Sequence, residues 1–450
     1  MANSRQTGFF DGNHPKSAQI SIRDRHELVR LADMIPWPDL IEAATTIRLS
    51  QIKAYSGPQP HYRELLGAVA LMSVKNITFR DAEDLIAHYA PARYLCSLMD
   101  SSWQPDHITI FEFTQMLGPD GMDMINKVIL LNAKDLGLLD PTRLMSDTTA
   151  QEAMIPYPNE VGLMKRFSDL VGKNLKKVSG KFSKVKTKIK EIASRVRGLA
   201  RHSHLFAKTK EQKRKVGTKL YHSTKEIHEL LKACVTAGYG GRTKAALELE
   251  RLSNVMGRLL PQILYFMKTG FVAARKIIHL QAPELYSIVR GKAGKSVEFG
   301  LKWGINRVDG FVLGFLIGNG KHASDQKFCI QAISEHTELF GSAPKTFGFD
   351  RGGYSKANIK RAHKLGVKNV GIAPTGKASW AVSDNKREAI QRERAQVEAA
   401  IGTAKSKKYR FNKPDAKRTR AMQTYGHRSF LGMNLMKTIR ELAAPPVRRA

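Results

Sequence analysis

The chain has 450 residues, of which 42% are hydrophobic and 25% are charged, so it can bury a large core and is neither a disordered protein nor a small stapled module. Its 74 Lys and Arg outnumber 40 Asp and Glu, which gives a formal net charge of +34. A folded chain with this excess repels itself unless a polyanion neutralises it. Nucleic acid is the commonest such partner, although a merely basic or ribosome-associated protein has the same balance.

Residues 1–25 are predicted to be a polar arm, and residues 26–138 a helical domain. Apolar residues recur at helical spacing from Leu28 to Ile35, and residues 79–86 are predicted to form a short helix with Thr78 as its N-cap. Two short helices around a tight connection are typical of a helix-turn-helix, so we expect this domain to bind DNA. Any small helical domain gives a similar pattern, and a purely structural role stays open.

Residues 139–410 are predicted to form an α/β domain. A strand at 144–149 precedes a helical segment at about 157–280, and a period of two then predicts a hairpin at 297–317 with Asp309-Gly310 as its turn. The elements that follow are a helix at 324–340, a strand at 346–349, a helix at 355–365, a strand at 367–373 and a helix at 383–405. This is the order of a ribonuclease H-like, retroviral-integrase-like domain, here with a helical insertion after its first strand.

The inserted segment is extremely basic. Residues 165–225 hold 20 Lys or Arg against three acids, while Ile189, Ile192 and Val196 keep helical spacing, so the charge is expected on folded helices. A basic helix face is often only solvated, but this density of Lys and Arg favours phosphate contacts. We select Lys186 and Lys190 for these contacts. Residues 411–450 are predicted to be a basic tail that adds DNA affinity or is only solvated.

Two aspartates stand where a metal site could form. Metal-dependent phosphoryl transfer needs several carboxylates that converge from different elements. Asp147 lies in the first predicted strand, and Asp350 directly follows the strand at 346–349, at the carboxyl end where open α/β sheets bind ligands. Either residue alone is more often a surface or helix-capping acid.

A third acid is expected from the helix at 383–405. The candidates are Glu388, Glu393 and Glu398. Glu398 shares a stripe about 60° wide with Gln391, Arg394 and Lys405, and this stripe borders the apolar face of the helix. Its position favours a metal ligand beside phosphate-binding cations. The alternative that Arg394 and Glu398 form an ordinary ion pair, one turn apart on an exposed helix, stays open.

These residues resemble the motifs of bacterial insertion-sequence DDE transposases. Arg394, Glu398 and Lys405 match the signature Y-x2-R-x3-E-x6-K, with Gln391 at the tyrosine position. The run Asp147-Thr148-Thr149 resembles the first-aspartate motif D-[GST]-T, and Asp350-Arg351-Gly352-Gly353-Tyr354 resembles the second, D-[KR]-G-Y, with one extra glycine. The resemblance extends from about residue 45 to residue 435.

The resemblance implies an enzyme that binds terminal inverted repeats, cleaves at the ends of the element and joins the 3′ hydroxyl to target DNA. It makes Asp147, Asp350 and Glu398 the ligands of two Mg²⁺ or Mn²⁺ ions. It implies DNA contacts for Arg394, Lys405, Gln391 and Arg351. Two ends must meet, so a homodimer is expected. Two alternatives remain: a catalytically inactive DNA-binding protein that keeps the fold, and a structure-specific nuclease that cleaves without joining.

The sequence also predicts where in the cell the protein is located. No stretch approaches 18 uninterrupted apolar residues, and the first residues lack an apolar targeting segment. Cys96, Cys234 and Cys329 are far apart and suggest no disulfide or zinc framework. We therefore expect a cytoplasmic, nucleoid-associated bacterial protein that does not bind membranes.

Overall fold

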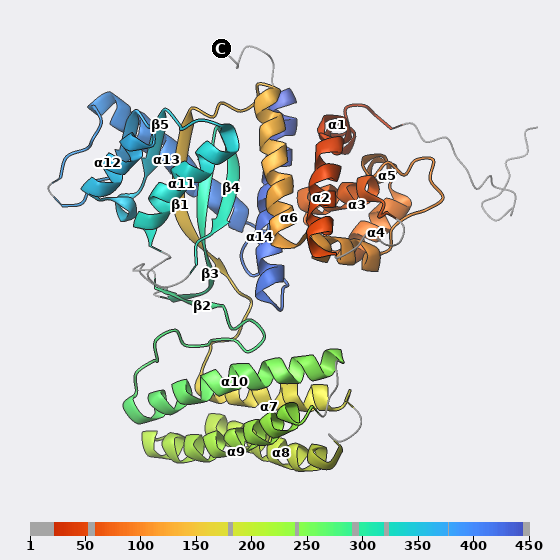
Figure 1. Cartoon of the computed structure of the whole chain (residues 1–450), viewed down its shortest axis with the longest axis vertical. Helices are drawn as coiled ribbons and strands as arrows, with labels where there is room; N and C mark the ends of the chain where they lie inside the picture. The colour runs from red at the N-terminus through yellow and green to blue at the C-terminus, as the bar shows by residue number, and fades with distance from the viewer. Residues whose placement is uncertain are drawn as a thin grey trace, which may run out of the picture. The chain divides into compact units, whose positions relative to one another are not determined.

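The computed structural model describes residues 22–52, 59–178, 183–238, 243–289, 297–318, 324–376 and 378–443 (Figure 1). The chain divides into two compact units, one of Met1–Leu117 with Leu435–Ala450 and the other of Gly118–Asn434. The first boundary falls inside helix α6 (His107–Asp135), where Gly118 has a φ of 58° and is followed by Pro119. This break precedes residue 138, at which the sequence predicted the helical domain to end.

The first unit is helical where it is described. Its elements are α1 (Glu27–Met34), α2 (Trp37–Gln51), α3 (Tyr62–Lys75), α4 (Phe79–His88), α5 (Ala90–Leu95), the part of α6 before Gly118 and the end of α14 (Thr419–Ala443) from Leu435 onward. Helix α4 begins where the sequence predicts, because Thr78 and Asp81 form a reciprocal capping box. Residues 76–78 join α3 to α4, and Asn76 takes the left-handed conformation that ends α3. The sequence pattern does not single out α2, α5 or α6.

A six-stranded mixed sheet forms the centre of the second unit. Its strands are β1 (Arg143–Glu152), β2 (Tyr286–Val289), β3 (Val297–Val308), β4 (Phe311–Leu316), β5 (Thr346–Phe349) and β6 (Asn369–Ile372). Strand β3 pairs antiparallel with β1, β2 and β4, whereas β1–β5 and β5–β6 are parallel. The β3–β4 turn is the predicted one, with φ of 46° at Asp309 and 85° at Gly310, as a two-residue hairpin turn needs. The sequence did not predict β2.

Helices cover both faces of this sheet, which confirms the predicted α/β class. Helices α11 (Asp325–Phe340), α12 (Lys356–Lys364) and α13 (Asp384–Lys405) follow the bounds expected from the sequence within a few residues. On one face, Phe328 of α11 packs with Leu144 and Phe347. On the other, Ile390 and Val397 of α13 pack on Met145. Since Leu144 and Met145 are neighbours in β1, the two layers alternate along the strand as a pleat requires.

Two glycines allow α13 to lie close to the sheet. Gly348 of β5 and Gly371 of β6 are register partners. A Cβ added at Gly371 would stand 2.5 Å from Cδ1 of Ile390, and one added at Gly348 would meet the sulfur of Met145 and stand 3.0 Å from Cγ2 of Ile390. Real Cβ atoms do not approach so closely. Ile390 therefore sits in a depression that larger residues would fill.

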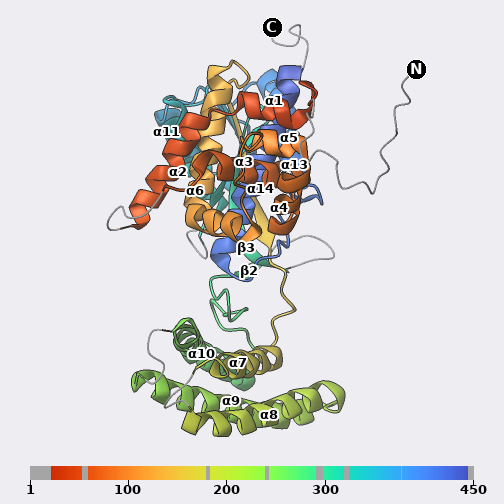
Figure 2. The same ribbon diagram turned by 90° about the vertical axis from the view of Figure 1, so that its right-hand side faces the viewer.

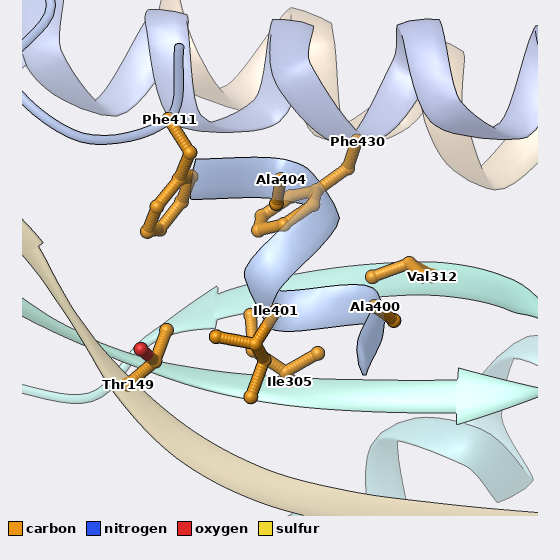
Figure 3. A pocket seen from close by; sticks show the side chains of 8 residues that line it. All are labelled: Thr149, Ile305, Val312, Ala400, Ile401, Ala404, Phe411 and Phe430. Atoms are coloured by element: carbon orange, nitrogen blue, oxygen red, sulfur yellow. The ribbon is translucent and has the colours of Figure 1, made fainter. Parts of the chain in front are cut away.

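The far end of α13 is anchored by an apolar cluster (Figure 3). Ile401 and Ala404 of α13 lie between Thr149 and Ile305 of the sheet and the rings of Phe411 and Phe430. Ile390 at one end and this cluster at the other fix the rotation of the helix about its axis. The residues between them, which include Glu398, are thereby held in one orientation.

The described residues of the insertion between β1 and β2, where residues 157–280 were predicted to be helical, form four helices. They are α7 (Glu160–Leu175), α8 (Ser183–Leu205), α9 (Lys210–Thr236) and α10 (Lys244–Thr269), seen from two directions in Figures 1 and 2. Their interior is a core of its own, with Phe167, Val196, Leu231 and Leu252 fully buried or nearly so. The stripe predicted through Ile189, Ile192 and Val196 of α8 belongs to this core.

The predicted basic tail is incorrect for most of its length. Residues 419–443 form helix α14 (Thr419–Ala443). Phe430 of this helix and Phe411 pack edge-on against Trp303 of β3, at ring distances of 5.8 Å and 5.6 Å, and Gly426 lies against the same indole. The prediction of a tail was based on the number of Lys and Arg residues, and it overlooked apolar side chains of α14 that are part of the core. No helix in the described ranges has an apolar stretch long enough to cross a lipid bilayer.

Candidate active site

Asp147 and Asp350 are brought together by the parallel pairing of β1 with β5. In this pairing Met145 lies opposite Gly348. The same register, continued two residues further, sets Asp147 beside Asp350 just beyond the end of β5. Because side chains alternate along a strand, Asp147 shares the face of Met145, which α13 covers. Two of the three predicted acids thus meet at one point on the sheet.

Helix α13 carries Glu398 to the same point. Val397, its neighbour in sequence, is buried against β1. Arg394, one turn earlier, has its Cγ 3.4 Å from where a Cβ on Gly348 would stand, so its stem crosses β5 shortly before the strand ends. Both Arg394 and Glu398 act electrostatically on the carboxyl group of Asp147. The predicted acids therefore converge from three elements that are distant in the sequence.

The carboxyl group of Asp147 is in an unfavourable environment for a negative charge. Burial, together with the charges of Asp350 and Glu398, raises its pKa to about 6. The backbone N–H of Thr148, which donates to Asp147 Oδ1 at 2.6 Å, and the guanidinium of Arg394 act in the opposite direction without cancelling the rise. The cost of burying this carboxylate therefore outweighs the favourable contacts that it makes.

Asp350 is in a similar position. Burial raises its pKa, and so does the neighbouring carboxylate of Asp325, while the N–H of Gly352, donating at 2.9 Å, and Arg394 oppose the rise. Gly352 is one of two consecutive glycines at the place where the motif D-[KR]-G-Y has one. A Cβ on Gly352 would stand 2.6 Å from Oδ2 of Asp325 and 3.0 Å from Oδ1 of Asp350. Gly352 therefore leaves room for two carboxylates side by side.

Asp325 is the residue of this site that sequence reasoning missed. It lies in the first turn of α11, after the N-cap Ser324. Its Oδ1 accepts hydrogen bonds from Nζ of Lys302 at 2.7 Å and from Oγ1 of Thr148 at 3.0 Å. These contacts tie α11, β3 and β1 together next to Asp350. In the sequence Asp325 has the pattern of an ordinary helix start, where acids are common, and nothing local distinguishes it.

The three carboxylates have the chemistry of ligands for a divalent cation. Asp147, Asp350 and Glu398 offer hard oxygen ligands of the kind that Mg²⁺ and Mn²⁺ prefer, and a cation would relieve their repulsion. Over the described ranges, no three His, Cys, Asp or Glu side chains stand close enough to hold an ion in their present conformations. Glu398 is exposed, whereas Asp147 and Asp350 are half-buried.

The other two candidate glutamates have less suitable positions. Glu393 accepts an ion pair from Arg143 at the start of β1, with Nη1 and Oε1 2.6 Å apart. It is therefore occupied in holding α13 to the edge of the sheet. Glu388 is exposed and precedes Ile390, near the start of the helix. Glu398 is the one that acts on the charge of Asp147.

The predicted DNA contacts lie in two places. Gln391 and Arg351 are exposed near the acids, on α13 and just after Asp350, and Lys405 is half-buried at the end of α13. Lys186 and Lys190 lie on α8 in the insertion, half-buried and exposed respectively. Within the described residues, no hydrogen bond or ion pair joins these two lysines to the three acids. The structure thus groups the α13 residues with the acids and leaves the α8 lysines to a separate surface.

Helix α8 has two basic flanks that differ in their neighbours. On one flank, Lys188 and Arg195 each stand 3.9 Å from the carboxylate of Glu226 on α9. Lys186 and Lys190 lie on the opposite side of the buried stripe, about one turn apart. The first flank is partly neutralised within the protein. The second flank also carries Arg197, which stands 3.7 Å from Asp169 of α7, but neither Lys186 nor Lys190 takes part in this ion pair.

A comparison with models of known protein families, with curated protein sequences and with solved structures found no match to this chain. The residues and geometry described above are therefore the basis on which its function is inferred. They comprise a cluster of carboxylates at a strand end, one arginine beside it and a strongly basic helical insertion.

Replacing Asp147 with Asn is expected to stabilise the metal-free protein in a pH-dependent way. The pKa of Asp147 is about 6 in the folded state and near its ordinary value of 3.8 in the unfolded state, so the folded state binds the proton more tightly. Proton binding by Asp147 therefore stabilises the folded state at low pH, and this stabilisation is lost as the pH rises through 6. Asn cannot ionise, so Asp147→Asn should raise the free energy of unfolding by about 1 to 3 kcal/mol at pH 8.

Urea unfolding in EDTA at pH 8 and pH 4.5 measures this effect. The advantage of Asp147→Asn should shrink at the lower pH, where the wild-type carboxyl group is largely protonated in the folded state. Glu393→Gln serves as the control, since it removes a paired carboxylate and should not stabilise the protein. An advantage of equal size at both pH values, or a less stable Asn variant, would contradict this electrostatic account.

Proposed function

We propose that the chain is a DDE transposase with a ribonuclease H-like catalytic domain. The observation that carries the proposal is the convergence of Asp147, Asp350 and Glu398 from β1, the end of β5 and α13. The order of elements supports the fold assignment, because the strand, hairpin, helix, strand, helix, strand and helix expected for that class are present in this order. The net charge of +34 supports a nucleic-acid substrate.

In this proposal Asp147, Asp350 and Glu398 hold two Mg²⁺ or Mn²⁺ ions. When bound, such ions activate the attacking oxygen and stabilise the leaving oxygen of a phosphodiester. The protein supplies carboxylates from rigid elements, with Gly348 and Gly371 setting the distance between α13 and the sheet. The attacking group is first water, for nicking at the element's end, and then the freed 3′ hydroxyl, for joining to target DNA.

Arg394 is assigned to the phosphate next to the scissile bond. Its stem is fixed over β5 at Gly348 and its guanidinium acts on both Asp147 and Asp350. A guanidinium held in this way can bind two phosphate oxygens without a large loss of side-chain entropy. Gln391, one turn earlier, can donate a hydrogen bond to the same backbone in place of the tyrosine of the family signature. Arg351 and Lys405 extend the contact along the DNA.

The proposed partners follow from the reaction. The substrate is double-stranded DNA that carries terminal inverted repeats, together with target DNA, and the enzyme acts on it in the bacterial cytoplasm. The helical N-terminal unit, with α3 and α4 joined by three residues, is assigned to DNA binding. A homodimer would hold the two ends. Joining distinguishes this enzyme from a nuclease, and metal-dependent cleavage distinguishes it from an inactive DNA-binding protein.

Glu398→Gln is expected to lower the rate of Mg²⁺-dependent cleavage by about 100-fold or more, because it removes a charged metal ligand. The measurement uses end-labelled duplexes that carry the DNA flanking the reading frame. Glu393→Gln is the matched control on the same helix. Its pairing with Arg143 is partly exposed and therefore worth little, so cleavage should stay within about threefold of wild type.

The products of the same assay separate the alternatives. Equal cleavage by wild type and Glu398→Gln would refute the assignment of the third acid. Cleavage without joined products would support a nuclease. If wild-type protein binds the duplex and never cleaves it with Mg²⁺ or Mn²⁺, the inactive DNA-binding protein is the better description.

The two flanks of α8 are expected to differ in DNA binding. Removing one cation that binds a phosphate should reduce the slope of log K against log salt concentration by about 0.9, so Lys186→Gln with Lys190→Gln should reduce it by about 2. Lys188→Gln with Arg195→Gln removes the same charge from the flank that Glu226 neutralises, and should change the slope much less. Fluorescence anisotropy with a labelled duplex over a range of salt concentrations measures both. Equal effects of the two pairs would rule out a selective role for Lys186 and Lys190.

A further inference from the structure

A second hollow lies where the chain leaves β1 and enters the insertion. It has a volume of about 530 Å³ and is formed by residues 154–158, the first turns of α7, residues 278–281 and residues 414–417. Pockets of 300 to 1,000 Å³ are of the size that encloses small ligands. Neither Asp147, Asp350 nor Glu398 lines it. The hollow is therefore separate from the candidate active site.

An exposed aromatic ring stands in this hollow. Tyr157 is 76% exposed and Met154 is 69% exposed, although both are large apolar side chains. Pro156 and Pro158 flank Tyr157 and restrict its backbone. Its ring also contacts Phe299 edge-to-face, at 5.6 Å and 84°. Tyr157 is thus held in place by its neighbours while most of its surface stays open, as a stacking platform must be.

The rim of the hollow carries a small excess of positive charge. Lys165, Arg166 and Lys417 line it together with Asp169 and Asp415. Arg166 is oriented by a hydrogen bond that its Nη2 donates to Oε1 of Gln281 at 3.0 Å. Asp169 stands 3.7 Å from Arg197 of α8, which neutralises part of its charge. The cations around the ring therefore favour an anionic ligand that also carries a flat apolar group.

His279 adds a polar group to the wall of the hollow. Its Nδ1 is buried and has no hydrogen-bond partner among the described residues. Burial, with the charges of Arg166 and Arg251, lowers its pKa, so the ring is neutral at neutral pH. A neutral imidazole offers one donor and one acceptor.

We propose that this hollow binds an unpaired nucleobase of the DNA substrate, stacked on Tyr157, with the adjoining phosphate near Arg166. The proposal rests on the proposed function for its choice of DNA. Strand β1 links the two sites, since it runs from Asp147 to Glu152, about 17 Å along the strand, before the chain reaches Tyr157. A strand end separated from its duplex near the acids can therefore extend toward the hollow.

Binding of a labelled single-stranded dT oligonucleotide tests the proposal, with a duplex of the same length as the second probe. Tyr157→Ala should weaken binding of the single strand by roughly 5- to 100-fold, because stacking on one aromatic side chain contributes that much. It should leave binding of the duplex unchanged. Tyr157→Phe keeps the ring and should bind the single strand nearly as well as wild type.

Phe271→Ala is the matched control, since Phe271 is 71% exposed but does not line the hollow. It should bind both probes like wild type. Unchanged single-strand binding by Tyr157→Ala would overturn the proposal, and so would an equal loss on the duplex or an equal loss in Phe271→Ala. Thermal unfolding checks that the variants are folded.

The proposal and the proposed function can fail separately. Glu398→Gln should keep the Tyr157-dependent binding, because the assay needs no cleavage. Tyr157-dependent binding without any cleavage by wild type would refute the enzyme and keep the hollow as a base-binding site. If cleavage depends on Glu398 but binding of the single strand does not depend on Tyr157, the base-binding site is refuted and the proposed enzyme stands.

Discussion

The burial of neighbouring carboxylates at one place on the sheet is the constraint around which the second unit is organised. Asp147, Asp350 and Glu398 are directed to one place, and the pKa of Asp147 is raised to about 6 by burial and by the other two charges. A fold gains no stability from such an arrangement. Arg394 and the backbone N–H groups of Thr148, Gly352 and Gly353 reduce the cost without removing it. Perturbed carboxylates of this kind are typical of functional sites, where a bound cation supplies the missing charge.

The rest of the fold maintains this arrangement. The β1–β5 register sets the two aspartates beside each other, and the paired glycines Gly348 and Gly371 let α13 approach the sheet. The cluster around Phe430 fixes the far end of α13. On the opposite face, the ion pair between Lys302 and Asp325 fixes the start of α11 next to Asp350. Each of these contacts joins segments that are distant in the sequence, so the acids converge only when the whole unit is folded.

Sequence reasoning reached most elements of the α/β domain in their order, and it selected three acids, for identifiable reasons. The change from a helical period to alternation marks β3 and β4, the Asp309-Gly310 pair marks their turn, and the stripe that Glu398 shares with Arg394 marks the third acid. It missed Asp325, because the proximity of the first turn of α11 to the end of β5 depends on packing across β3. It mistook α14 for a tail, because the cations were counted and the apolar spacing was not.

Titration of the protein with Mn²⁺, followed by electron paramagnetic resonance of the free ion, tests the central claim most directly. Wild-type protein and Glu393→Gln should each bind two ions per chain, since Glu393 is paired with Arg143. Asp147→Asn and Glu398→Gln should lose at least one of the two or bind them about 10-fold more weakly or worse. If wild type binds no Mn²⁺, or binds it equally well in all four proteins, the three carboxylates do not form a metal site.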